Sequence, residues 1–342
     1  MKGLITFSEV PSTSVVRWQK INNFLKSVDL DVSEDVELFI VAKQDDHIVA
    51  CAGLSGRVLK NIAIDETIRG KGIALRLMSE LLKVAYREKR SDLFLFTKPI
   101  YQEMFEDCGF KYIEQSHHEV ILMENSNNIE HQKEALRAHK KEGKRIGSIV
   151  INANPFTLGH RHLVEQACLN SDWVHLFVVK EDASFFSFKD RYHLIQEGLK
   201  HIANLTIYEG SDYIISKATF PTYFIKDKCH IDSLYTELDL NIFRNHLAPQ
   251  LEITHRFVGE EPICVVTNEY NQQMKKILSS PSNHPSIEVI EIPRIEYKGE
   301  PISASRVRRL MGEKNLEEIS HLVPPTTYQL IEKMLSNTIE EK

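Results

Sequence analysis

Two short segments of the sequence carry residue types that bind phosphate groups. The first is Asn154-Pro155-Phe156-Thr157-Leu158-Gly159-His160, which follows an apolar run at residues 149–151 and precedes a helical pattern. A strand, a loop and a helix N-terminus in this order form half of a parallel βαβ unit, whose ligands lie beyond the carboxyl ends of the strands. Because the N–H groups and the positive dipole end of a helix favour anions, this order predicts an anion site at the start of the helix.

Three residues of this segment suit such a site. Thr157 can cap the helix and offer a hydroxyl group, Gly159 lets a ligand approach the backbone, and His160 places an imidazole on the first turn. Taken alone, the segment fits equally well an ordinary N-capped helix with an incidental histidine.

The second segment, Ile302-Ser303-Ala304-Ser305-Arg306, strengthens the phosphate interpretation. Small hydroxyl residues again begin a helical pattern, and here Arg306 falls in the first turn. A cation near a helix N-terminus is unfavourable by roughly a few tenths of a kcal/mol, so Arg306 suggests an anion to neutralise. The alternative is an ordinary surface arginine.

Two further loops follow apolar strands in the same half of the sequence. Gly259-Glu260-Glu261 carries two carboxylates, which either face solvent or orient a ribose and a metal-bound nucleotide. The aromatic loop at residues 180–188 is either a lid over the site or a plug of the core.

Another glycine-rich segment lies nearer the N-terminus. Arg69-Gly70-Lys71-Gly72-Ile73-Ala74 stands between a strand pattern at residues 59–64 and a long helical pattern. Two glycines and two cations in this position make a second anion cradle, because bare backbone N–H groups can wrap a pyrophosphate.

Length and composition limit the class of protein. A chain of 342 residues is expected to form two domains, which we place at residues 1–124 and 146–342 with a charged linker at 125–145. The net charge of −6 argues against a nucleic-acid partner. The five cysteines form no CxxC pair, which fits buried thiols in a reducing compartment. No leader pattern or apolar window of about 18 residues is present, so we expect a cytoplasmic protein without a membrane partner.

The paired segments resemble the signatures of the T/HxGH nucleotidyltransferase superfamily, which transfers adenylyl groups from ATP with loss of pyrophosphate. The wider string at residues 154–162, together with residues 258–262 and the N-terminal region, resembles the citrate lyase ligase family. This resemblance covers nearly the whole chain.

The N-terminal region resembles the GNAT acetyltransferases. Arg69, Gly72 and Ala74 fit the pattern of their coenzyme A pyrophosphate loop, and residues 105–110 stand where they carry Tyr-Glu-x-x-Gly-Phe. Here the tyrosine that can protonate a leaving thiolate is replaced by Phe105, which has no proton to give. The resemblance therefore implies binding of a CoA-like group without implying acetyl transfer; the alternative is a fold kept only as a scaffold.

Together these resemblances imply an α/β protein, with a GNAT-like α+β domain followed by a Rossmann-like, doubly wound parallel sheet. They imply an AMP-forming ligase that uses ATP and acetate to form an acetyl-adenylate. A thiol then captures the acetyl group, and the family implies that it belongs to the dephospho-CoA-type prosthetic group of the citrate lyase acyl carrier protein. Two alternatives are an adenylyltransferase that makes a dinucleotide from a phosphorylated small molecule and a sensor that only binds nucleotide and CoA.

The resemblance also implies roles for individual residues. His160 and Thr157 contact the phosphates undergoing displacement, while Ser303, Ser305 and Arg306 hold the β and γ phosphates. Asn154, Phe156, Gly159 and Gly259 belong to the same ATP site, and Mg²⁺ is held mainly by the phosphates without a protein ligand that can be named. The residues implied for the CoA-like arm are Arg69, Gly70, Lys71, Gly72 and Ala74.

Overall fold

The computed structural model describes residues 4–180, 184–214, 228–261, 265–281 and 283–340. Part of the aromatic loop, residues 181–183, and Pro262 of the 258–262 string lie outside the described residues, as do the side chains of Cys229 and Cys264. The described part of the chain contains no helix long and apolar enough to cross a membrane.

The chain forms two compact units. Unit 1 contains Met1–His131 and Thr219–Ile242, and unit 2 contains Gln132–Ala218 and Phe243–Lys342. The described part of the second segment of unit 1, residues 228–242, therefore belongs with the N-terminal sheet although it lies in the C-terminal half of the sequence.

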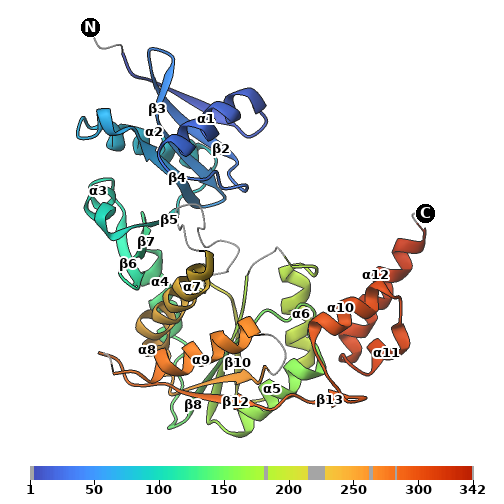
Figure 1. Ribbon diagram of the computed structural model, residues 1–342. Helices are drawn as coiled ribbons and strands as arrows, with labels where there is room; N and C mark the ends of the chain where they lie inside the picture. The colour runs from blue at the N-terminus through green and yellow to red at the C-terminus, as the bar shows by residue number, and fades with distance from the viewer. Residues whose placement is uncertain (1–3, 181–183, 215–227, 262–264, 282, 341–342) are drawn as a thin grey trace. The chain divides into compact units, whose positions relative to one another are not determined.

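Unit 1 is built on a seven-stranded sheet with the order β1-β2-β3-β4-β5-β7-β6 (Figure 1). The strands are β1 Thr6–Pro11, β2 Leu38–Gln44, β3 His47–Ser55, β4 Val58–Ile64, β5 Phe94–Thr97, β6 Lys111–Ser116 and β7 Val120–Glu124. The helices are α1 Val15–Ser27, α2 Ile73–Arg87, α3 Gln102–Asp107, α4 Asn128–Arg137, which runs across the unit boundary, and α7 Lys228–Ile242, with short 3₁₀ turns at Glu66–Ile68 and Pro99–Tyr101.

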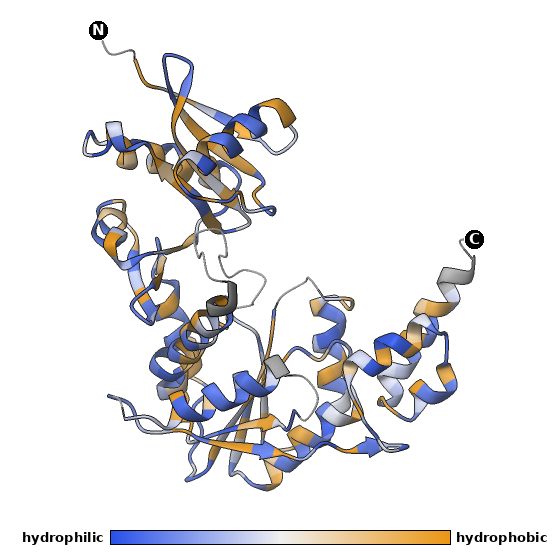
Figure 2. Cartoon of the chain, viewed as in Figure 1, coloured by the Kyte–Doolittle hydropathy of each residue, from blue (hydrophilic) through white to orange (hydrophobic). Residues whose placement is uncertain are grey.

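Both faces of this sheet are buried. In β2, Ile40 faces the cluster that contains Leu77 and Leu81 of α2, while Phe39 faces the cluster that contains Leu25 of α1. Because successive side chains of a strand point to opposite faces, a strand covered on both sides is a continuous apolar run. Figure 2 shows this concentration of apolar residues on the strands.

Strands β4 and β5 are parallel, but they pair only at Val58↔Phe94 and Leu59↔Leu95. Their carboxyl-terminal parts are therefore not joined by a ladder. A cavity of about 250 Å³ lies there, lined by both strand ends and by the segment that precedes and begins α3.

Helix α7 covers the edge strand β6 of unit 1. Its Glu237 accepts hydrogen bonds from the Ser116 hydroxyl at 3.2 Å and from the His117 N–H at 3.1 Å, and Asn241 donates to the Gln115 carbonyl at 3.2 Å. Leu238 is fully buried. Covering an edge strand satisfies backbone groups that would otherwise be open to another chain.

Unit 2 contains a five-stranded parallel sheet with the order β10-β9-β8-β11-β12. The strands are β8 Ile146–Ile151, β9 Trp173–Val178, β10 Leu205–Glu209, β11 His255–Gly259 and β12 Glu288–Ile292, and a small hairpin is formed by β13 Glu296–Tyr297 and β14 Glu300–Pro301. The helices are α5 Leu158–Leu169, α6 Phe188–Leu199, the π-helical turn Phe243–Leu247, α8 Ala248–Leu251, α9 Val265–Ser279, α10 Ala304–Gly312, α11 Leu316–Ser320 and α12 Pro325–Glu340.

Helices cover both faces of this sheet. Val164 of α5 and Leu194 of α6 pack with Leu176 on one face, while Phe243 contacts Phe177 on the other, with ring centroids 6.4 Å apart. The predicted doubly wound parallel sheet is confirmed. Its strand order reverses between β8 and β11, and in such sheets ligands bind at this switch point, outside the carboxyl ends of the strands.

Candidate functional site

The loop after β8 brings Thr157 and His160 together at the switch point. Thr157 is the N-cap of α5, and its Oγ1 accepts a hydrogen bond from the His160 N–H at 3.3 Å. In return, Nδ1 of His160 accepts from the Thr157 N–H at 3.1 Å and lies 2.9 Å from Thr157 Oγ1. The two residues thus form a reciprocal capping box that fixes the imidazole.

This box also determines which ring nitrogen carries the proton. Because Nδ1 accepts a hydrogen bond from a backbone N–H, the neutral ring must hold its proton on Nε2. Within the described part of the chain, Nε2 of His160 has no hydrogen-bond partner. The imidazole therefore offers one N–H donor at the carboxyl edge of the sheet.

The charge state of His160 follows from its surroundings. Burial, and secondarily the positive charge of Arg294, lower the pKa of His160 to about 4. Both effects disfavour the imidazolium, so the ring is neutral at physiological pH.

Gly159 makes a close contact between the two phosphate-binding segments. A Cβ placed on Gly159 would lie 2.6 Å from the carbonyl oxygen of Ile302, which immediately precedes the N-cap of α10. The missing side chain therefore admits the backbone of the second segment, and close approach of a ligand at Gly159 stays a prediction. The two helix N-termini meet at one place as a result.

Phe156 lies beneath the loop. Its ring is 0% exposed and stacks on the His160 ring, with centroids 5.9 Å apart and an interplanar angle of 18°. A Cβ on Gly198 would approach Phe156 Cε1 to 2.5 Å. The ring is thus enclosed between α6 and the imidazole and supports the imidazole, while a contact with the nucleotide stays a prediction.

Asn154 joins the first loop to its neighbours. Its Oδ1 accepts a hydrogen bond from the Phe186 N–H at 3.0 Å, and its carbonyl accepts one from Arg308 of α10. The peptide bond between Asn154 and Pro155 is cis. Phe186 is buried in the core, whereas Phe185 is 61% exposed, so the described part of the aromatic loop contains both a plug and an exposed ring.

The N-terminus of α10 presents the two predicted hydroxyl groups. Ser303 is the N-cap, and its Oγ accepts from the Arg306 N–H at 3.2 Å and lies 3.0 Å from Oγ of Ser305. Ser305 is exposed. Ser303 and Ser305 follow Ile302, the residue whose carbonyl oxygen lies against Gly159, by one and three positions in the chain.

The guanidinium of Arg306 is bound within the protein. It donates to the carbonyls of Tyr297 at 2.9 Å and Glu300 at 3.0 Å and to Oε1 of Glu318 at 2.6 Å, and the residue is only 7% exposed. This differs from the predicted phosphate contact, because these bonds fasten α10 to the β13–β14 hairpin and α11. The arginine of α10 that reaches the first loop is instead Arg308.

A periodicity argument could have found Arg308. Ser305 and Arg308 are three positions apart on a helix and therefore share a face, whereas Arg306 is turned away from Ser305. The sequence prediction used only the distance of each residue from the helix N-terminus.

The loops after β11 and β12 form the other side of the switch point. No atom of the described residues lies within 4 Å of a Cβ built on Gly259, and the Gly259 carbonyl accepts a hydrogen bond from Asn271 at 3.2 Å. Arg294, which the sequence prediction missed, donates to the Glu260 carbonyl at 2.6 Å and pairs with the Glu261 carboxylate. A cation soon after a strand of a parallel sheet was the available signal.

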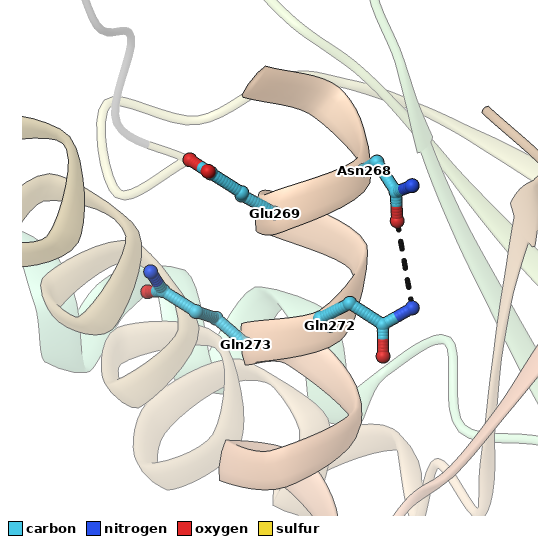
Figure 3. Close-up of a pocket in the computed structure, with 4 residues that line it drawn as sticks. All are labelled: Asn268, Glu269, Gln272 and Gln273. Carbon is cyan, nitrogen blue, oxygen red and sulfur yellow. Dashed lines mark hydrogen bonds between the residues drawn. The ribbon is translucent and has the colours of Figure 1, made fainter. Parts of the chain in front are cut away.

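A hollow of about 410 Å³ lies beside α9. Figure 3 shows Glu269 and Gln273 on one side of this helix and Asn268 and Gln272 on another, with the Asn268 carbonyl oxygen accepting from Gln272 at 3.4 Å. Another residue of this helix, Asn271, donates to the Gly259 carbonyl at 3.2 Å and so ties α9 to the end of β11.

In unit 1, the glycine-rich loop has the backbone of an anion cradle. Gly70 and Gly72 have φ angles of 75° and 70°, which favour glycine. Gly72 is the N-cap of α2, and no side chain caps that helix. Lys71 donates to the Thr67 carbonyl at 2.9 Å, and the half-exposed Arg69 lies against Glu66 at 3.2 Å.

The cavity between β4 and β5 opens onto this loop. Its lining includes Arg69, Thr97, Lys98, Tyr101 and Phe105. Phe105 belongs to this lining, and its phenyl ring has no acidic proton.

Among the residues described, no three His, Cys, Asp or Glu side chains are grouped as metal ligands would be. The described cysteines, Cys51, Cys108 and Cys168, are free thiols, with Cys51 and Cys168 buried.

We expect the imidazole of His160 to be neutral, with its proton on Nε2, throughout the range from pH 6 to 8. Nitrogen-15 NMR of the ring should show this tautomer, and the titration midpoint should lie near pH 4. Since the folded pKa lies below the unfolded value of about 6.5, this group makes the protein less stable as the pH falls from 6.5 towards 4. Loss of the signal in His160→Asn assigns it, and a midpoint near 6.5 would contradict the proposed environment.

Arg306 and Arg308 should have separable roles. Arg306→Gln removes bonds to two carbonyls and a carboxylate, so we expect its melting temperature to fall by roughly 5 °C. Arg308→Gln should keep nearly the wild-type melting temperature but weaken calorimetric binding of inorganic pyrophosphate by about tenfold. The reverse pattern would return the phosphate role to Arg306, and Arg309→Gln controls for the loss of one positive charge.

Comparisons with known proteins agree on a family. The family described as "Citrate lyase ligase C-terminal domain" matches residues 146–331, and the family described as "Acetyltransferase (GNAT) domain" matches residues 35–112. The chain is 48% identical to the [Citrate [pro-3S]-lyase] ligase of Klebsiella pneumoniae over 92% of each chain. It is 44% identical to that of Escherichia coli (strain K12), over 100% of this chain and 97% of the relative.

Among solved structures, Thermotoga maritima TmcAL bound with alpha-thio ATP aligns with 56% of each chain at 14% identity and a TM-score of 0.37. Identity above 40% along nearly the full length of both relatives, with a family match over more than half of the sequence, shows that the chain belongs to the citrate lyase ligase family.

Proposed function

We propose that this chain is an ATP-dependent ligase that acetylates the prosthetic-group thiol on the acyl carrier protein of citrate lyase and thereby activates that enzyme. The observation that carries the proposal is the neutral His160 on the first turn of α5, at the switch point of a nucleotidyltransferase-like sheet, where the adjacent Gly159 contacts Ile302 just before the N-cap of α10. Relatives named as ligases along the full chain favour this reaction over dinucleotide synthesis. The site supports catalysis by positioning and charge stabilisation.

The first step is adenylation of acetate. A carboxylate oxygen of acetate forms a bond to the α-phosphorus of ATP, and the bond between that phosphorus and the bridging oxygen breaks, so that its electron pair leaves with pyrophosphate. Nε2–H of His160 donates to a phosphate oxygen as negative charge develops there. The N-termini of α5 and α10, with Ser303 and Ser305, bind the phosphates through N–H and hydroxyl donors.

Arg308 supplies a positive charge between these helices, because it extends from α10 to the Asn154 carbonyl in the first loop. A Mg²⁺ ion that accompanied ATP would be held mainly by the phosphates and would supply further positive charge, without grouped ligands from the residues that the structure describes. Thr157 fixes the imidazole, and Phe156 supports it from below.

The second step transfers the acetyl group. The thiol sulfur attacks the acetyl carbon of the adenylate, the carbon–oxygen bond to AMP breaks, and the thiol proton is released to water. No side chain of the protein forms a covalent intermediate in either step.

We assign the prosthetic arm to unit 1. The uncapped N-terminus of α2 and the loop at residues 69–74 suit the pyrophosphate of a dephospho-CoA-type group. The cavity of about 250 Å³ beside the loop suits the chain that leads to the thiol. Because Phe105 cannot protonate a thiolate, the unit presents the thiol and leaves the chemistry to unit 2.

The central test is acetate-dependent exchange of labelled pyrophosphate into ATP. His160→Asn keeps an acceptor near the position of Nδ1 but removes the Nε2–H, so exchange should fall on the order of 100-fold, equivalent to roughly 3 kcal/mol, with the fold retained. His160→Gln, which keeps a donor near Nε2, should be less impaired. Folded variants with normal exchange would contradict the role of His160, and a wild type without acetate-dependent exchange would contradict the ligase itself.

The arm assignment predicts a loss confined to the second step. Gly72→Asp should lower acetylation of the carrier at least tenfold, because it adds a negative charge where the pyrophosphate binds, while pyrophosphate exchange remains near the wild-type rate. Gly72→Asn is the matched control: Asn and Asp both tolerate positive φ, so the pair differs mainly in charge. Equal carrier acetylation by the two variants would mean that the loop does not hold the arm.

A further inference from the structure

Arg294 stands out at the carboxyl edge of the parallel sheet. It follows β12, which pairs in parallel with β11 through Gly259↔Ile292, and the Glu260 N–H donates to the Ile292 carbonyl at 3.0 Å. The loops after β11 and β12 therefore begin side by side. This places Arg294 on the opposite side of the switch point from the loop after β8.

One edge of the Arg294 guanidinium is held by the protein. Nε donates to the Glu260 carbonyl at 2.6 Å, and Nη2 pairs with the Glu261 carboxylate, whose side chain is only 9% exposed. These two bonds use adjacent N–H groups along a single edge of the planar group. They fix its orientation as a bidentate clamp would.

The remaining edge is open. No residue that the structure describes accepts a hydrogen bond from Nη1 of Arg294, and 27% of the side chain is exposed. The guanidinium also lies close enough to His160 for its charge to act on the imidazole. An oriented cation with donors that no described residue uses and the Nε2–H of His160 thus belong to the same carboxyl edge of the parallel sheet.

We propose that Arg294 binds the polyphosphate chain of ATP through its Nη1 edge, across the crevice from His160, and that Glu261 positions it for this role. The identity of the ligand as ATP rests on the proposed function, whereas the recognition of a polyphosphate rests on the geometry. The carboxylate of Glu261 accordingly acts through Arg294 and does not touch the nucleotide.

This arrangement explains why a carboxylate is present beside an anion site. A carboxylate facing the phosphates would repel them, but one paired behind a guanidinium holds the cation in place and leaves its second edge for the ligand. The nearby imidazole is neutral, so Arg294 supplies charge where His160 supplies a directed hydrogen bond.

The test uses the full-length protein and inorganic pyrophosphate as the probe, measured by calorimetry. Arg294→Gln should weaken binding at least tenfold, and Arg294→Lys should recover only part of the loss, because an ammonium group cannot reproduce the fork. Glu261→Gln should weaken binding less than Arg294→Gln does. Arg309→Gln, which removes an exposed arginine of α10, should bind as the wild type does.

A kinetic measurement separates substrate contact from a structural effect. In the exchange assay, Arg294→Gln should raise the KM for ATP at least tenfold while the KM for acetate stays within twofold. Millimolar guanidinium, but not equal sodium chloride, should partly restore Arg294→Ala. Wild-type pyrophosphate affinity in a folded Arg294→Gln, or equal rescue by both salts, would overturn the proposal.

The proposed ligase function and the proposed role of Arg294 can fail separately, and the two assays distinguish these failures. If the wild type shows no acetate-dependent exchange but its pyrophosphate affinity depends on Arg294, the proposed function fails and the polyphosphate site stands. If exchange is present and Arg294→Gln binds and reacts as the wild type does, the inference about Arg294 fails and the proposed function stands.

Discussion

The candidate site depends on the contact between Gly159 and the Ile302 carbonyl. Any side chain at Gly159 would meet that oxygen, since even a Cβ would lie 2.6 Å from it. The contact sets the N-termini of α5 and α10 next to each other, and like dipole ends repel unless an anion lies between them. The two adjacent helix N-termini therefore favour binding of a negatively charged ligand between them. Burial of His160 keeps its ring neutral and avoids one more positive charge.

The arginines near the site share the same guanidinium group, but their different contacts give them different roles. Arg306 is bonded to two carbonyls and Glu318 and therefore maintains the shape of the C-terminal part of unit 2. The fully buried Arg191 likewise donates to the carbonyls of Asn152 and Val179, which holds the ends of β8 and β9 together. Arg308 and Arg294 remain partly exposed and extend towards the crevice.

Local patterns predicted much of this architecture, and tertiary contacts decided the rest. Short stretches of neighbouring residues determine the parallel strands, the N-caps Thr157 and Ser303 and the glycine-rich loop. These features could therefore be predicted from the sequence. The role of Phe156 depends on α6, and the use of Arg306 depends on Glu318. No local pattern reveals such partners. Arg294 was missed because its signal, a cation soon after a strand of a parallel sheet, is weak and belongs to no motif.

Helix α7 has a consequence for the order in which the protein is made. It covers the edge strand β6 of unit 1, yet residues 132–218 of unit 2 precede it in the chain. The ribosome therefore releases all seven strands of the N-terminal sheet, the last of which ends at Glu124, long before the helix that covers its edge. Until residue 242 has emerged, β6 keeps an open edge, and such edges pair readily with other chains. The N-terminal unit is consequently covered along this edge only after the first segment of unit 2 has been synthesised.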